Sequence, residues 1–208
     1  MADKRHGREM LQGTGKTSGS HDSHRELRRF RLAWPAFIDG FATIAMLAAL
    51  AMALRTPLVF PSLGPTAFLL FFAPDSPAAC PRNTLYGHAV GILCGYTALW
   101  LTGLQYAPSA MLEGVNLPRV VAAGLSLALT GGLMILFGVV HPPAGATTLI
   151  ISLGIITQPL HLLIIEAAVA LVTLQAVVTH RLRGVAYPLW APRTVTGSLN
   201  RAHPDDIP

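Results

Sequence analysis

From residue 32 onward the sequence is dominated by long apolar stretches separated by short polar or proline-rich breaks. Six stretches follow one another, at about 36–54, 57–73, 85–104, 120–140, 142–157 and 159–180. A hydrocarbon core about 30 Å thick needs about 20 helical residues. The first, third, fourth and sixth stretches are therefore predicted to span a membrane as helices, whereas the second and fifth are short for this role.

The two short stretches are apolar enough for the membrane, but each begins with prolines and a glycine. No Asp, Glu, Lys or Arg occurs from Thr56 to Pro74 or from Val120 to Ile165. Proline resists a continuous helix at its own position and at the residue before it. Each short stretch is therefore predicted to be broken or re-entrant. We prefer six segments in the membrane, and four full spans is the alternative that the sequence leaves open.

The two short stretches also resemble each other. Residues 61–66, Pro-Ser-Leu-Gly-Pro-Thr, align with residues 142–147, Pro-Pro-Ala-Gly-Ala-Thr, 81 positions later. One apolar segment precedes each copy and one follows it, and units with an odd number of crossings lie upside down relative to each other. We therefore predict an all-α polytopic membrane protein made of two inverted three-segment repeats. Chance similarity between two proline-glycine breaks is the alternative.

Composition and charge agree with a membrane location. Hydrophobic residues make up 52% of the 208 residues and charged residues only 12%, about half the charged share of a soluble domain. Cations gather in two tails, residues 1–31 and 182–208, around a predicted transmembrane domain at 32–181. The positive-inside rule predicts that both tails lie in the cytoplasm. We expect the membrane to be a bacterial inner membrane. We expect a disordered N-terminal tail, a lipid bilayer as partner, and no nucleic acid, because no aromatic platform accompanies the cations.

The most distinctive candidate site is the break at residues 141–147, His-Pro-Pro-Ala-Gly-Ala-Thr. The first amides of the half-helix that follows should be unpaired and carry the positive end of its dipole, which suits a small inorganic anion. The matching break would present a second half-helix start from the other unit. That the prolines only end a helix is the alternative. The site residues are His141, Pro142, Pro143, Gly145 and Thr147 from one break, and Pro61, Gly64, Pro65 and Thr66 from the other.

Four further polar residues are candidates for an ion pathway. Arg82 and Asn83 come directly before the third apolar stretch, His88 lies within it, and Glu166 lies in the last stretch. An ionisable side chain in a transmembrane segment is unfavourable unless it is paired or hydrated, so His88 and Glu166 should face protein or water. An interfacial cation and a helix cap are the structural alternatives for Arg82 and Asn83.

Small residues recur every four positions on three predicted helices. They are Gly87, Gly91 and Gly95, then Ala45, Ala49 and Ala53, then Gly124, Ala128 and Gly132. Such stripes let helix backbones approach closely, which predicts a compact bundle or a homo-oligomer. The histidines and the two cysteines lack the spacing of a metal site, and no pair of nucleophile and base is evident. We expect no metal, no cofactor, no catalytic residue and no enzyme activity.

With these residues the chain resembles the HPP family of integral membrane proteins, which is called after its His-Pro-Pro motif. The resemblance rests on residues 61–67, on Pro81-Arg82-Asn83 with Gly87-His88, and on residues 141–147. Family members are multi-pass membrane proteins, and some from plastids and cyanobacteria are associated with nitrite transport. The resemblance therefore implies a permease or channel for a small monovalent anion, nitrite first. A non-transporting membrane sensor or assembly scaffold is the alternative.

Overall fold

The computed structural model describes residues 18–192, and every regular element in this part of the chain is helical. Four helices are long: α1 (Ser18–Leu54), α3 (Pro81–Leu101), α5 (Leu117–Leu136) and α7 (Pro159–Leu182). Two are short, α2 (Leu63–Phe72) and α6 (Ala144–Ser152), and α4 (Ala110–Glu113) and the 3-10 helix η1 (Pro77–Ala79) are single turns. The predicted all-α class is confirmed for these residues.

Three of the described helices are long and apolar enough to cross a membrane. They are Ala33–Leu54 within α1, then α5 and α7, and they match the first, fourth and sixth predicted spans. The 21 residues of α3 reach about 31 Å, but this helix is less apolar because it carries Arg82, Asn83 and His88. With 10 and 9 residues, α2 and α6 reach only about 15 Å. Neither short helix crosses by itself, and the count of six crossings stays a prediction.

The predicted boundary between tail and membrane domain differs from the structure at the N-terminal side. The sequence predicts disorder up to residue 31, whereas α1 begins at Ser18 and runs without a break into its apolar part. A helix can extend beyond the membrane where polar residues still favour helical backbone, and hydropathy does not detect this extension. Residues 1–17 lie outside the described residues.

The predicted C-terminal tail also begins differently, because its first residues fold back onto the bundle. Tyr187 is buried, stacks on His180 of α7, and donates a hydrogen bond to the carbonyl oxygen of Ala79 in η1. Burial raises the pKa of the Tyr187 hydroxyl, so this group stays protonated and remains a donor. Residues 193–208 lie outside the described part of the chain.

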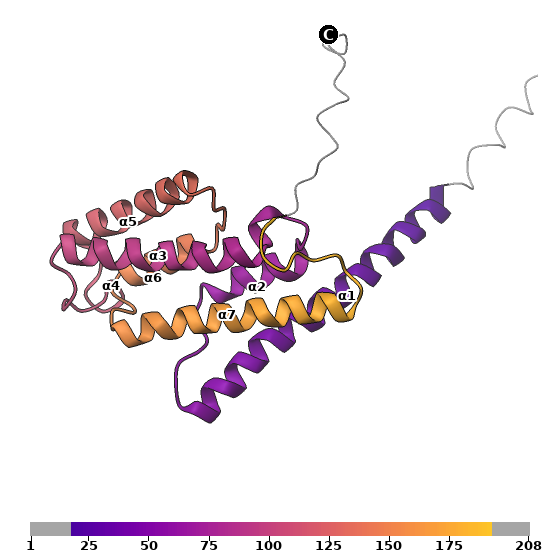
Figure 1. Cartoon of the computed structure of the whole chain (residues 1–208), viewed down its shortest axis with the longest axis horizontal. Coiled ribbons are helices and arrows are strands. Elements are labelled where there is room, and N and C mark those ends of the chain that lie inside the picture. Colours follow the sequence, from indigo (N-terminus) through magenta and orange to yellow (C-terminus); the bar gives the residue numbers. More distant parts are fainter. Residues whose placement is uncertain (1–17, 193–208) are drawn as a thin grey trace, which may run out of the picture. The chain divides into compact units, whose positions relative to one another are not determined.

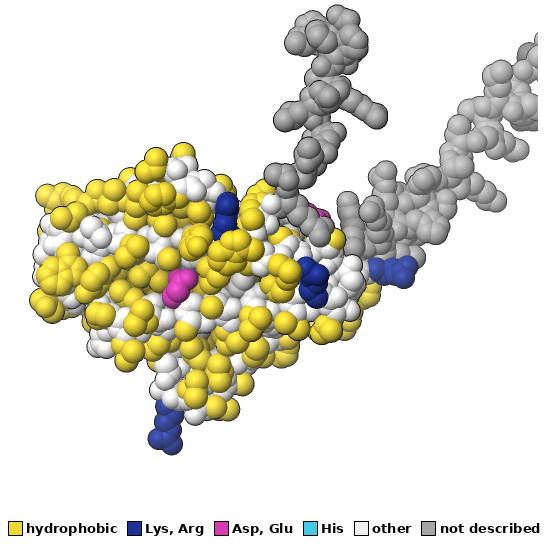
Figure 2. All heavy atoms as spheres, in the orientation of Figure 1, with side chains coloured by type: hydrophobic (Ala, Val, Ile, Leu, Met, Phe, Trp, Pro, Cys, Tyr) yellow, Lys and Arg dark blue, Asp and Glu magenta, His cyan; other side chains and the backbone are white. Residues whose placement is uncertain are grey.

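The chain divides into two compact units, residues 1–41 and 42–208, and the second unit is a helical bundle around α3. Figure 1 shows α3 beside α5, α6 and α7, and contacts also join α5 to α6 and α2 to α7. The fully buried core includes Leu63, Leu70, Leu99, Ile151, Ile165, Val169 and Val172. On the face drawn in Figure 2, hydrophobic side chains cover most of the bundle and charged ones are isolated, which suits contact with lipid.

The glycine stripe of α3 lets α6 approach it closely. A Cβ added at Gly91 would lie 2.7 Å from the carbonyl oxygen of Ala144, and one at Gly95 would lie 2.8 Å from that of Thr148. The predicted packing role of this stripe is therefore confirmed, and its partner is α6 of the same chain. At Gly132 of α5 no atom lies within 4 Å of the added Cβ, so the stripe on α5 is open.

We expect Gly91→Leu to destabilise the bundle strongly, because the new side chain would push against the α6 backbone. Overpacking at a close contact costs about 1–3 kcal/mol or more. Gly132→Leu is the matched control, since the same side chain enters open space. Detergent-solubilised protein should lose its monodisperse chromatographic peak at a lower temperature for Gly91→Leu than for Gly132→Leu. Equal midpoints would contradict this packing.

Candidate functional site

Two histidines and two threonines form one hydrogen-bonded cluster inside the bundle. Thr66 lies in the first turn of α2, His88 in α3, and Thr147 in the first turn of α6, while His141 stands directly before the two prolines that precede α6. All four side chains are 0% exposed. Each is among the residues predicted from the sequence, and the structure brings these four together. We call them the His-Thr cluster.

His88 joins the two short helices through its two ring nitrogens. Its Nε2 lies 2.8 Å from Thr66 Oγ1, and its Nδ1 lies 2.7 Å from Thr147 Oγ1. The two threonines are the aligned threonines of the sequence copies, and each is the fourth residue of its helix. The starts of α2 and α6 therefore meet at one imidazole.

His141 completes the cluster from the side of the proline break. Its Nδ1 lies 2.8 Å from the carbonyl oxygen of Ala78, and its Nε2 lies 3.4 Å from Thr66 Oγ1. The ring centroids of His88 and His141 are 4.9 Å apart. A carbonyl oxygen only accepts, so the Nδ1 of His141 carries a hydrogen and donates it to Ala78.

Ser62 adds a buried hydroxyl beside the start of α2. Its side chain is 0% exposed, and its Oγ has no hydrogen-bond partner among the described residues. A serine just before a helix is usually a cap, but this one makes no capping hydrogen bond. An unpaired buried hydroxyl is unfavourable, which makes Ser62 a candidate ligand contact that sequence reasoning missed.

The prediction of free amides at the start of α6 is wrong. The N–H groups of Ala144, Gly145 and Ala146 donate to the carbonyl oxygens of His141, Pro142 and Pro143, at 3.1, 2.9 and 3.0 Å. The consecutive prolines fix the backbone in a tight turn, and its carbonyls lie within reach of these amides. Pro142, Pro143 and Gly145 therefore shape the break, and the polar contacts of the site come from side chains.

The other break contributes less to the cluster than its sequence predicts. Pro61, Gly64 and Pro65 are exposed, and the Leu63 N–H is paired with the carbonyl oxygen of Phe60 at 2.9 Å. Only Thr66 of the four predicted residues reaches the cluster. The turn places that threonine but leaves its own proline and glycine residues at the surface.

The model of the family described as "HPP, transmembrane region" matches residues 25–188 of the chain. The chain belongs to the HPP family. The match extends beyond the predicted domain 32–181 on both sides, into the polar part of α1 and into the segment that holds Tyr187. With its apolar helices, this HPP family member is a membrane protein.

A curated relative places the chain beside another membrane protein. A transmembrane protein of Dictyostelium discoideum is 28% identical over 144 residues, which cover 69% of this chain and 46% of the relative. The HPP chain thus spans about half the length of the relative that it matches. No solved structure matches the chain.

The remaining predicted residues of the HPP chain make their described contacts outside the His-Thr cluster. Arg82 donates from Nη2 to the carbonyl oxygen of Gly138 at 3.1 Å, and Asn83 donates to that of Pro77 at 2.9 Å. These hydrogen bonds connect the start of α3 to η1 and to the segment that follows α5. Glu166 is half-buried on α7, and its Oε2 has no hydrogen-bond partner in the described part of the chain.

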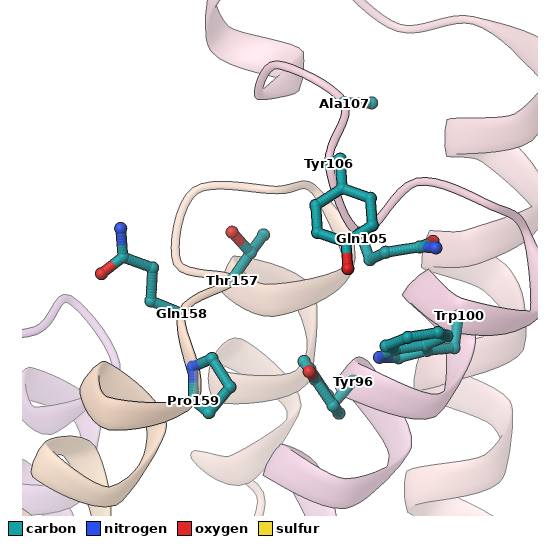
Figure 3. Close-up of a pocket in the computed structure, with 8 residues that line it drawn as sticks. All are labelled: Tyr96, Trp100, Gln105, Tyr106, Ala107, Thr157, Gln158 and Pro159. Atoms are coloured by element: carbon teal, nitrogen blue, oxygen red, sulfur yellow. The ribbon is translucent and has the colours of Figure 1, made fainter.

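A pocket of about 410 Å³ opens near the C-terminal end of α3 (Figure 3). Its lining residues are Tyr96, Trp100, Gln105, Tyr106, Ala107, Thr157, Gln158 and Pro159. Figure 3 shows the Tyr106 hydroxyl pointing toward the space between Tyr96 and Trp100. The lining is aromatic and uncharged, and sequence reasoning did not single it out because its residues come from three separate segments.

Arg119 is a buried cation that sequence reasoning also missed. It is 2% exposed, and its guanidinium donates to the carbonyl oxygens of Ser152 at 3.1 Å, Ala107 at 3.3 Å and Pro108 at 2.6 Å. An added Cβ at Gly154, where φ is +77°, would lie 2.6 Å from Nη2. Arg119 therefore caps the end of α6 in the HPP fold, where helix carbonyls lack partners. The sequence did offer one signal for a role of Arg119. Between residues 32 and 180 the only other Lys or Arg residues are Arg55 and Arg82.

Proposed function

We propose that this HPP protein is a permease for a small monovalent anion, with nitrite as the first substrate to test. The observation that carries the proposal is the position of His88, which is wholly buried and bonded to the first turns of two broken helices. Discontinuous helices that meet inside a bundle are the usual setting of substrate sites in secondary transporters. The imidazole and hydroxyl groups that meet there can donate hydrogen bonds to an anion.

The spacing of the helices supports the inverted repeat that the proposal assumes. The first residues of α2 and α6, Leu63 and Ala144, are 81 positions apart, and so are the last residues of α3 and α7, Leu101 and Leu182. The aligned breaks have the same separation. The first proposed repeat contains α1, α2 and α3, and the second contains α5, α6 and α7. The short helix of each repeat packs against the long third helix of the other, α6 on α3 and α2 on α7, as a two-fold relation requires.

The directions of α3 and α7 agree with the same relation. The Arg82 N–H at the start of α3 donates to the carbonyl oxygen of Trp190, which follows α7, at 3.0 Å. Trp100 near the end of α3 shares a pocket with Pro159, the first residue of α7. The two helices therefore run in opposite directions, as equivalent helices of inverted units do.

Transport through this site needs the short helices to separate. Because the His-Thr cluster is 0% exposed, an anion can reach it only when the contact of His88 with Thr66 or with Thr147 opens. Opening one contact at a time would expose the site to one side of the membrane and then to the other. In the proposed orientation both termini lie in the cytoplasm of a bacterium, and Arg82 attracts the anion at the cytoplasmic mouth.

The test is uptake of nitrite into vesicles that contain the purified protein. Nitrite trapped inside is measured by diazotisation, and protein-free vesicles give the leak through the lipid. We expect uptake above this leak that saturates with nitrite and is inhibited by other small monovalent anions, but not by sulfate. Absence of uptake with well-folded protein would contradict the permease and favour the sensor or scaffold.

A further inference from the structure

The hydrogen bonds of the His-Thr cluster have a direction that follows from their carbonyl ends. Thr66 Oγ1 lies 3.0 Å from the carbonyl oxygen of Ser62, and this oxygen only accepts, so the Thr66 hydroxyl donates to it. Having given its one hydrogen, Thr66 accepts from Nε2–H of His88. The Nδ1 of neutral His88 is then bare and accepts from the Thr147 hydroxyl.

One acceptor in the cluster receives no hydrogen. His141 donates from Nδ1 to Ala78, so the Nε2 of the neutral ring carries only a lone pair. That lone pair lies 3.4 Å from Thr66 Oγ1, with no hydrogen between the two atoms. The cluster therefore has room for one more proton, and its place is between His141 and Thr66.

We propose that each anion moves together with one proton, and that the proton passes from His88 to His141 through the hydroxyl of Thr66. This inference rests on the proposed permease function and adds its coupling ion. Both imidazoles contact the same hydroxyl oxygen, so Thr66 is the link through which a proton can move between them.

The proposed transfer balances in protons and bonds. A proton from water binds Nδ1 of His88 when the contact with Thr147 opens. The Thr66 hydroxyl first turns away from the carbonyl oxygen of Ser62, so that its hydrogen bond to this oxygen breaks and its hydrogen faces Nε2 of His141. The Nε2–H bond of His88 then breaks as its hydrogen joins Thr66 Oγ1, while the original Thr66 hydroxyl hydrogen leaves and bonds to Nε2 of His141. His88 is neutral again as the other tautomer, Thr66 is a hydroxyl again, and His141 carries the positive charge beside the break before α6.

No charged side chain is among the described contacts of the two imidazoles. On the helices packed against α3, Arg119 and His180 bond to carbonyl oxygens elsewhere, and Glu166 and His161 make no described hydrogen bond to the cluster. Among these described contacts, no carboxylate lies beside His141 to neutralise a proton on its ring. The anion itself can supply the compensating charge, which makes joint binding of proton and anion favourable.

The experiment measures nitrite uptake and internal pH in the same vesicles, with the membrane potential set by potassium and valinomycin. We expect one proton to enter with each nitrite, and the uptake rate to be unchanged by about 100 mV of inside-negative potential, which opposes entry of an anion alone. Uptake that is slowed by this potential and leaves internal pH unchanged would overturn the coupling while leaving the permease intact. No uptake at all would instead contradict the proposed function.

The variants Thr66→Val and Thr66→Ser separate the relay from a packing role. Valine keeps the shape of threonine without the hydroxyl, so we expect proton-coupled uptake to fall about 100-fold, the scale of a lost proton-transfer group. Serine keeps the hydroxyl and should retain most of the coupled uptake. Proton-coupled uptake at the wild-type rate in Thr66→Val would overturn the relay.

A measurement on the resting protein applies even if Thr66→Val fails to fold. Nitrogen NMR of the wild type with labelled histidine should show His88 protonated on Nε2 and His141 on Nδ1. Addition of acid should place the first extra proton on His141. Two results would overturn the proposed direction of proton transfer: His141 protonated on Nε2 in the resting protein, or His88 taking up the first extra proton.

Discussion

For the proposed permease, His88→Ala should lower nitrite uptake about 100-fold, because the imidazole that bonds to the first turns of both α2 and α6 is lost and misplacement of about 1 Å has effects of this size. His88 makes short hydrogen bonds to both short helices, at 2.8 and 2.7 Å, which no other described residue does. The measurement is initial uptake into vesicles at matched protein content.

Two further variants show whether such a loss reflects transport or folding. His88→Gln keeps groups that can donate and accept hydrogen bonds, so it should remain folded but still transport poorly. His161→Ala removes a half-buried histidine from the start of α7 and should keep wild-type uptake. Uptake by His88→Ala at the wild-type rate would remove the cluster from the pathway.

Arg119→Met should prevent accumulation of folded protein. The substitution removes the donors of three carbonyl oxygens, the buried one of Ser152 and the partly buried ones of Ala107 and Pro108. Each such group costs about 1–3 kcal/mol, against a total stability of about 5–15 kcal/mol for a typical domain. The yield of monodisperse protein after extraction is the measurement. A wild-type yield with an unchanged thermal midpoint would show that the cap is dispensable.

A pair of glycine variants isolates the steric part of this cap. Gly154 and Gly103 both have positive φ, +77° and +69°, but only Gly154 has the Arg119 guanidinium against its Cβ position. Each alanine substitution carries the backbone strain, about 1 kcal/mol. Gly154→Ala should therefore have a clearly lower thermal midpoint than Gly103→Ala. Equal midpoints would mean that the guanidinium moves aside freely.

The sequence predicts the helical class and the pairing of the two breaks because both depend on local pattern. Apolar length shows which segments can meet lipid, and Pro and Gly show where a helix must stop, which located α2 and α6. The same pattern could not show that His88 bonds to both Thr66 and Thr147, because that contact depends on how α3 packs between the short helices. The alignment of Thr66 with Thr147 was the sequence feature that came nearest to predicting this contact.

The errors have a common physical origin in backbone hydrogen bonding. The first amides of an isolated helix are unpaired, but the turn through Pro142 and Pro143 supplies carbonyl oxygens to the first amides of α6. The role of Arg119 was missed for a related reason. Its partners are backbone carbonyl oxygens, and residue type does not show which carbonyls need a donor. Residue type indicates which side chains can bond, whereas the fold decides which backbone groups are left to them.

The contact between α2 and α7 has a consequence for synthesis of the protein. The carbonyl oxygen of Leu70 in α2 accepts a hydrogen bond from His180 of α7, 2.9 Å away but 110 residues later in the chain. A ribosome delivers the chain in order, so α2 leaves the insertion machinery long before its partner exists. The hydrogen bond between Leu70 and His180 can therefore form only after α7 has been synthesised.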